Sequence, residues 1–142
     1  MLKYLTHVQP LTMIAVLFAV VVARGTPHAV RVGPNVCVSA AHPADTHYEV
    51  VVTADPHDPS RLVAGSIIYP RIAATYGTIV YQSADGGAHW APSLELPDLD
   101  HTGDPAVTFA PDSVAYYVAS SLPTSGERRL LLFRYSDGLS FL

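Results

Sequence analysis

The chain has 142 residues, a length that suits one domain. Its formal net charge is −4, with only 8 lysines and arginines, which predicts no nucleic-acid interface, because such interfaces need clustered basic residues. Charged residues make up 14% of the chain and prolines number 12, a balance that favours short strands joined by turns over long helices.

Residues 1–29 have the pattern of an export signal. Lys3 gives a short positive start, and residues 11–23 form an apolar run without any charge. A bilayer span needs roughly 20 residues, so this run suits the apolar part of a signal peptide better. We therefore predict a secreted or extracytoplasmic protein with no stable membrane span. An uncleaved anchor formed by residues 11–23 is the alternative.

Residues 30–47 have little periodicity, and we interpret them as a linker or an irregular first strand. Cys37 is the only cysteine, so an intrachain disulfide and a zinc site built on several cysteines are excluded. Its place between Val36 and Val38 is typical of a small apolar residue. The seven histidines are spread without a ligand spacing, and we predict neither a metal site nor a cofactor.

Residues 49–66 and 104–121 match each other without a gap at an offset of 55. An acidic residue, Glu49 or Asp104, opens each copy. Six positions are identical: Val52, Thr53, Pro56, Val63, Ala64 and Ser66 fall on Val107, Thr108, Pro111, Val118, Ala119 and Ser121. Each copy is followed by a third apolar run and an Asp-Gly pair.

A repeat of about 50 residues made of short strands is typical of a propeller blade. We predict an all-β fold with antiparallel four-stranded blades, a partial propeller over residues 48–142 with blades at 48–97 and 98–142. The strands are expected at 48–54, 62–69, 78–83 and 89–94 in the first blade. In the second blade they are expected at 106–110, 114–120, 130–135 and after residue 139. An ordinary β-sandwich is the alternative.

A hairpin turn is predicted within YQSADGGAHW, residues 81–90. Asp85 can accept hydrogen bonds from backbone N–H groups of the turn, and Gly86 and Gly87 allow the positive φ that it needs. Ser83 can bond across the neck, and Trp90, the only tryptophan, can cover the turn. This arrangement needs neither a metal nor a partner, so we interpret it as scaffold.

The spacing Ser83-x-Asp85-x-Gly87-x-x-Trp90 resembles the Asp-box, or BNR repeat, of sialidases and related propellers. All four defining positions are present, and the resemblance extends over residues 48–138. The segment 135–141 resembles a decayed second copy that is one residue short. The resemblance implies six blades in complete members, so we expect this chain to be an N-terminal piece. The remaining blades, or another chain, are then needed to cover its open edges.

The same resemblance implies a glycoside hydrolase that acts on terminal sialic acid, with a sialoside-like glycan as ligand. Its catalytic set is three arginines, a Tyr–Glu pair and an aspartic acid, and most of it has no counterpart here. Arg71, in an Arg-Ile context, and Asp104, at a strand start, are the two weak catalytic candidates. We expect the chain to be inactive alone. A non-catalytic Asp-box propeller used for binding or assembly is the alternative.

Overall fold

The computed structural model describes residues 32–72, 75–96, 101–136 and 140–141. The chain divides into two units, Met1–Pro34 and Asn35–Leu142, and all the strands lie in the second. The predicted export signal, 1–29, and the alternative anchor, 11–23, lie outside the described residues. Within the described ranges, no helix has the length and apolarity that crossing a bilayer requires.

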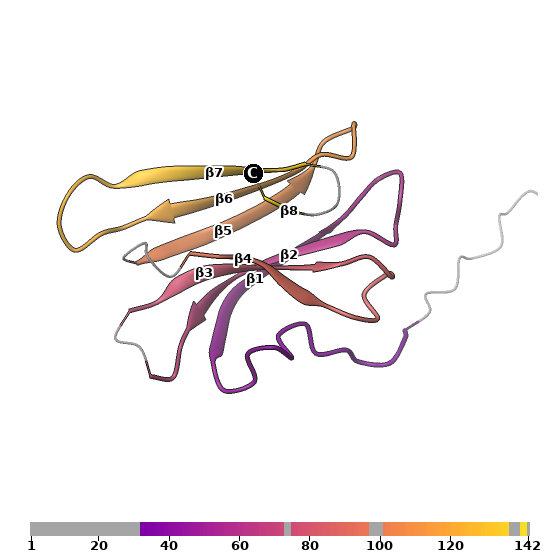
Figure 1. Cartoon of the computed structure of the whole chain (residues 1–142), viewed down its shortest axis with the longest axis horizontal. Coiled ribbons are helices and arrows are strands. Elements are labelled where there is room, and N and C mark those ends of the chain that lie inside the picture. Colours follow the sequence, from indigo (N-terminus) through magenta and orange to yellow (C-terminus); the bar gives the residue numbers. More distant parts are fainter. Residues whose placement is uncertain (1–31, 73–74, 97–100, 137–139, 142) are drawn as a thin grey trace, which may run out of the picture. The chain divides into compact units, whose positions relative to one another are not determined.

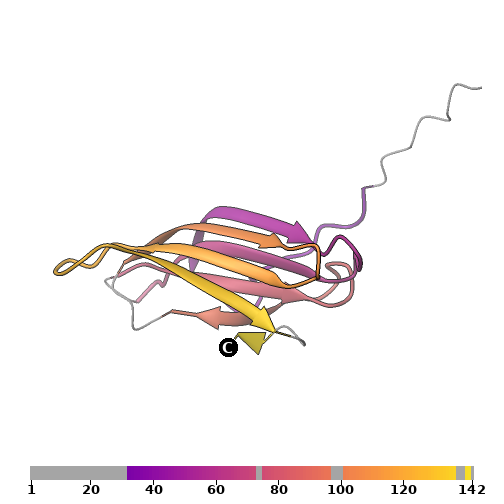
Figure 2. The same cartoon turned by 90° about the horizontal axis from the view of Figure 1, so that it is seen from above.

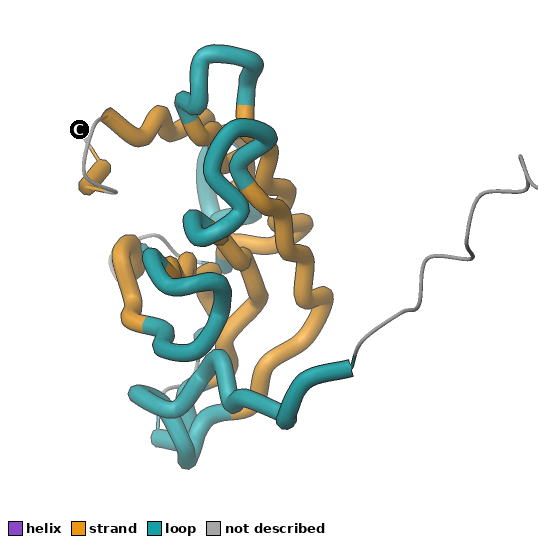
Figure 3. The backbone as a smooth tube through the Cα atoms, turned by 90° about the vertical axis from the view of Figure 1, so that its right-hand side faces the viewer, coloured by secondary structure: helices purple, strands orange, loops and turns teal. Residues whose placement is uncertain are grey.

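The predicted all-β, antiparallel fold is confirmed: two sheets are present, and the described ranges contain no helix (Figures 1 and 3). In each sheet the strands follow chain order, so neighbours in the sequence are neighbours in space. The first sheet consists of β1 (Thr46–Ala54), β2 (Leu62–Tyr69), β3 (Gly77–Ser83) and β4 (Ala91–Glu95). The second consists of β5 (Thr102–Phe109), β6 (Ala115–Ser121), β7 (Arg129–Ser136) and β8 (Ser140–Phe141).

The starts of β5 and β4 differ from the predicted residues 106 and 89. β5 begins at Thr102 and not at residue 106, because its ladder with β6 continues through a bulge on the N-terminal side of the expected start. β4 begins at Ala91 and not at residue 89, because His89 and Trp90 belong to the preceding turn. The other strands lie within two residues of their predicted bounds, and Leu62–Tyr69 has them unchanged.

The two sheets have the same strand arrangement, but the turn between their first two strands differs in length. β1 has a register shift between Tyr48 and Val51, and β5 has one 55 residues later. The following turn is two residues shorter in the second sheet, at 110–114 against 55–61. The second strands are therefore offset by 53 residues and not by 55. The identities found in β1 and β5 occupy equivalent positions, whereas those assigned to β2 and β6 do not.

The main apolar cluster contains residues of both sheets, whose strands overlie one another when the molecule is seen from above (Figure 2). It contains Val63 and Val80 from the first sheet and Ala115, Tyr117, Ala119 and Tyr135 from the second, all at most 1% exposed. The absence of a side chain at Gly65 lets the sheets pack closely there, since an added Cβ would lie 3.2 Å from a ring carbon of Tyr117. Polar contacts flank this cluster: the Thr78 N–H donates to Thr102 Oγ1 over 2.7 Å, and the Ser93 and Tyr135 hydroxyls are 2.8 Å apart.

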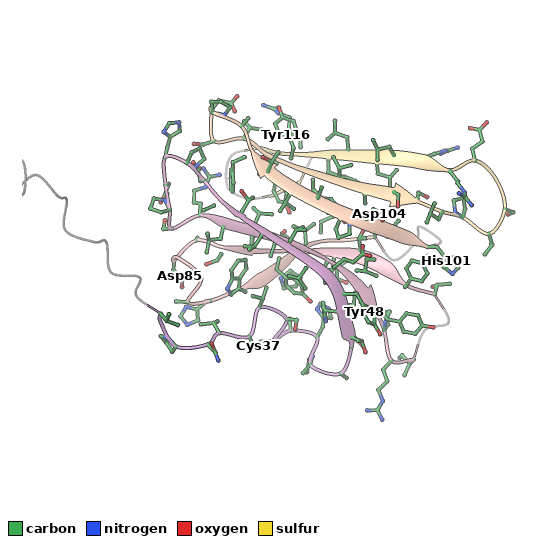
Figure 4. The ribbon with its side chains drawn as sticks, turned by 180° about the vertical axis from the view of Figure 1, so that it is seen from behind. Cys37, Tyr48, Asp85, His101, Asp104 and Tyr116 are labelled. Carbon is green, nitrogen blue, oxygen red and sulfur yellow. The ribbon has the colours of Figure 1, made fainter. Side chains whose placement is uncertain are left out.

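The other side of the first sheet is covered by the segment that precedes β1. Ala64, Ile79 and Tyr81 form a second buried cluster, against which Val38 and Trp90 pack. The described part of this segment, residues 32–45, contains turns and no strand. Cys37 lies there with its side chain exposed, and not in an apolar core as its neighbours suggested (Figure 4).

Candidate functional site

The β3–β4 turn is closed by hydrogen bonds between its own residues. The Ser83 hydroxyl donates to Asp85 Oδ1 over 2.9 Å and accepts the Gly87 N–H over 2.9 Å. Asp85 Oδ1 also accepts the His89 backbone N–H over 2.9 Å, and Oδ2 lies 2.5 Å from His89 Nδ1. The indole N–H of Trp90 donates to the Gly87 carbonyl over 3.0 Å. We call this arrangement of residues 83–90 the clasp.

The clasp favours the ionised form of its carboxylate. The His89 backbone N–H, then the His89 ring and the Ser83 hydroxyl, lower the pKa of Asp85 to about 2. Gly86 and Gly87 adopt φ values of 72° and 90°, which glycine allows without a Cβ penalty. These bonds hold the turn in shape, and the Gly86 N–H donates to the Ser60 carbonyl over 2.8 Å, which ties the clasp to the β1–β2 turn.

Asp85→Ala is expected to lower the melting temperature by several degrees, because it leaves the His89 N–H without its acceptor and removes the partner of the Ser83 hydroxyl. Thermal unfolding followed by circular dichroism measures this effect. Asp112→Ala is the matched control, since Asp112 is exposed and accepts only the Val114 N–H in another turn. Equal losses in the two variants would contradict a special role for the clasp.

An open cleft of about 530 Å³ lies at the opposite end of the strands from the clasp, between the starts of β1 and β5 (Figure 4). Its lining combines aromatic, apolar and acidic groups: Tyr48, Glu49, Ile67, Tyr69, Tyr76, Gly103, Asp104 and Leu122. Tyr48 and Tyr69 are 54% and 44% exposed, so their rings are available to a ligand. His101 packs edge-on against Tyr76, with ring centroids 4.7 Å apart.

The two acids of the cleft occupy equivalent positions of the two sheets. Glu49 and Asp104 lie in the bulges of β1 and β5, 55 residues apart, and each has a φ of 51°. A positive φ is uncommon for residues with a Cβ. Here it occurs within a β-bulge of each strand, at the edge of the cleft. Asp104 Oδ2 accepts the Ser120 hydroxyl over 2.7 Å, and both acids are exposed. Strained non-glycine residues of this kind gather at functional sites.

The structure separates the residues that the sequence singled out. Asp104 lines the cleft, whereas Arg71 does not. Arg71 is exposed in the β2–β3 turn, and its backbone N–H donates to Asp45 Oδ1 over 3.0 Å. Ser83, Asp85, Gly87 and Trp90 come together in the clasp, at the other end of the strands. Of the decayed second copy, 135–141, residues 137–139 lie outside the described residues.

The tyrosines of the cleft were missed by sequence reasoning. Glu49 carried a usable signal, because it aligns with Asp104 in the repeat. Tyr48, Tyr69 and Tyr76 carried none, since they come from separate segments that the pairing of β1, β2 and β3 brings together. The packing of β1 against β5 then adds Asp104 to the same cleft.

Two histidines meet one buried tyrosine on the outer side of the first sheet. His42 Nδ1 and His47 Nε2 lie 2.9 Å and 2.8 Å from the Tyr81 hydroxyl oxygen. His42 Nε2 also lies 3.5 Å from Glu95 Oε1. Burial lowers the pKa of His47, assisted by the charge of His42, while a hydrogen bond and the charge from Asp45 oppose it. This group holds the segment before β1 on the sheet.

The stability of the protein is expected to fall as the pH is lowered below about 6.5, the ordinary pKa of histidine. The pKa of His47 is lower in the folded state, so the unfolded state binds more protons and acid favours it. The contribution is fully present above that value and is lost as the pH falls through the folded pKa. Urea unfolding at pH 7.5 and 5.5 measures it, and His47→Gln should reduce the difference. An unchanged difference in this variant would assign it to other groups.

Comparison with protein-family models, with curated proteins and with solved structures gave no match. Among the described residues, no group of three or more His, Cys, Asp and Glu side chains could hold a metal ion. The cleft and the clasp therefore have to be interpreted from their own chemistry.

Proposed function

We propose that the chain forms two blades of an Asp-box propeller of the sialidase-like type. Two observations support this proposal. Both sheets are antiparallel and follow chain order with a bulge at the same place in the first strand, as repeated blades would. The Ser83, Asp85, Gly87 and Trp90 side chains and backbone groups bond to one another, as a structural box requires.

The ligand of this propeller is a glycan, and it binds in the cleft between β1 and β5. The single observation that carries this assignment is the combination of tyrosine rings with carboxylates in one open cleft. Binding sites commonly pair aromatic walls with a few polar groups that fix orientation. The exposed rings of Tyr48 and Tyr69 can cover the C–H faces of a sugar, while Glu49 and Asp104 can accept its hydroxyl protons.

The chain binds glycan without hydrolysing it. The arginine that a sialidase-like clamp would use first, Arg71, lies outside the cleft lining, and bidentate arginine is what recognises a sugar carboxylate. We expect no turnover of a fluorogenic sialoside by the purified chain, together with glycan binding measured by calorimetry. Tyr48→Ala and Tyr69→Ala should weaken that binding, whereas Tyr116→Ala, outside the cleft lining, should not. Turnover above the buffer rate would overturn the proposal of an inactive chain.

Assembly is a second candidate function, favoured by exposed apolar side chains on two strands. Leu130 and Leu132 on β7 are 76% and 66% exposed, and Val50 and Val52 on β1 are 62% and 63% exposed. Apolar surface of this kind marks interaction sites when it is contiguous. Light scattering on the purified protein tests this role: a monomer that binds no partner at high concentration would remove it.

We also propose that the protein is exported, with residues 1–29 as the signal. The support is the charge-free run at 11–23 behind Lys3. N-terminal sequencing of protein from the culture medium tests this, since an anchor at 11–23 would leave the full chain in the membrane fraction.

A further inference from the structure

The charge of the cleft selects among sugars. We infer that the cleft between β1 and β5 binds amino sugars, in the form of short glucosamine oligomers, and discriminates against sialic acid. This inference rests on the proposed glycan-binding function and names its ligand class. It follows from the composition of the cleft wall and from the pairing state of its two acids.

The cleft wall carries two carboxylates and no cation among the described residues. Glu49 and Asp104 line it, while the lining contains no lysine, arginine or histidine. Neither acid belongs to an ion pair within the described part of the chain, where the salt bridges involve Asp55, Asp85 and Glu95. Asp104 receives one neutral hydroxyl donor, from Ser120. The cleft therefore presents a net negative charge to whatever enters it.

An anionic sugar is disfavoured in such a cleft. The carboxylate of sialic acid would enter beside two like charges and would find no guanidinium to accept it. A neutral sugar avoids the repulsion and gains only hydroxyl contacts. An amino sugar gains more, because its ammonium donates charge-assisted hydrogen bonds to a carboxylate.

The tyrosines of the cleft also favour a ligand that carries an ammonium. Tyr48, Tyr69 and Tyr76 border the two acids, and an ammonium over a tyrosine face is attracted by the ring. The exposed rings of Tyr48 and Tyr69 also supply flat apolar surface for the pyranose. A volume of about 530 Å³ is within the range of small-molecule sites. One ligand class satisfies both the rings and the acids: a ring-shaped polyol that carries an amine.

Calorimetry with the full chain at pH 7.0 and low salt tests the inference with three probes: the glucosamine tetramer, the N-acetylglucosamine tetramer and sialyllactose. Because the acids are exposed, we expect the glucosamine tetramer to bind about three- to tenfold more tightly than its acetylated form. Added salt should remove most of that preference. Sialyllactose should bind most weakly.

The variants Glu49→Gln and Asp104→Asn should each reduce the preference for the glucosamine tetramer over the acetylated tetramer. Asp112→Asn is the control, because it removes an equal charge outside the cleft and keeps an acceptor for the Val114 N–H. Tighter binding of sialyllactose, or equal binding of both tetramers, would overturn the amino-sugar inference and leave the glycan-binding proposal intact. Failure of all three probes would overturn both.

Discussion

Tyr117→Ala is expected to lower the free energy of unfolding by about 3–5 kcal/mol, the range for truncating a large buried aromatic side chain. Tyr117 is 0% exposed and lies in the cluster between the two sheets. Its ring stacks on Phe133, with centroids 5.9 Å apart, and borders Gly65 of the first sheet. Removing the ring leaves a cavity between the sheets, beside Gly65. Glycine at position 65 provides no side chain to fill that cavity.

Urea unfolding followed by the fluorescence of Trp90 and by circular dichroism measures this loss. Tyr117→Phe should cost much less, because it keeps the ring and removes only the hydroxyl, whose pKa burial raises to about 12 against a hydrogen bond with Thr78. Tyr116→Ala is the neighbouring control, since Tyr116 is only partly buried and belongs to the next position of β6. If Tyr116→Ala cost as much as Tyr117→Ala, the cluster between the sheets would not be the centre of stability.

Local sequence determined the features that could be predicted. β2 could be placed at Leu62–Tyr69 because turn residues bound an apolar run on both sides. The hydrogen bonds inside the clasp could be predicted because their partners lie within residues 83–90. The bond from the Gly86 N–H to the Ser60 carbonyl depends on another turn and could not be predicted. The repeat in the first strands was visible because its identical residues are neighbours in the sequence, Val52 and Thr53 in β1 and Val107 and Thr108 in β5.

Features that depend on the packing of one sheet against the other could not be predicted. The cleft joins Tyr76, before β3, to Asp104, in β5, and nothing in either segment indicates the other. The offset of β2 against β6 was wrong because a gapless comparison cannot register a turn that is two residues shorter. Arg71 resembled a ligand group by its neighbours alone, and its place in an exposed turn follows from the course of the chain between β2 and β3.

The hydrogen bonding of the buried Asp55 carboxylate also depends on how the two sheets pack. This carboxylate is 0% exposed and accepts three hydrogen bonds, two from the β1–β2 turn and one from the β5–β6 turn. Oδ1 accepts the His57 N–H over 2.9 Å and the Ser113 hydroxyl over 2.8 Å, and Oδ2 pairs with Arg61 Nη1 over 2.7 Å. Ser113 belongs to the β5–β6 turn and has a φ of 63°. One buried acid therefore ties the first sheet to a strained residue of the second.

Asp55→Ala is expected to destabilise the protein more than Asp85→Ala, because the Asp85 side chain is 42% exposed and water can replace part of its bonding. Truncation at Asp55 leaves the Arg61 guanidinium without its anion and the Ser113 hydroxyl without its acceptor, and breaking a buried pair costs more than the pair contributes. Asp55→Asn should be intermediate, since its amide oxygen can still accept from His57 and Ser113. Melting temperatures of the three variants, measured together at pH 7, give the order directly.

The pH dependence distinguishes a charge effect at Asp55 from a loss of packing. Burial raises the pKa of Asp55, but the His57 N–H, the Ser113 hydroxyl and the Arg61 charge outweigh it, so the folded pKa lies below its usual value. Its contribution to stability is therefore present at neutral pH and is lost as the pH falls through the folded pKa. The difference in stability between the wild type and Asp55→Asn should shrink in acid. A difference that stays constant down to pH values below both pKa values would mean that Asp55 acts through shape and not through its charge.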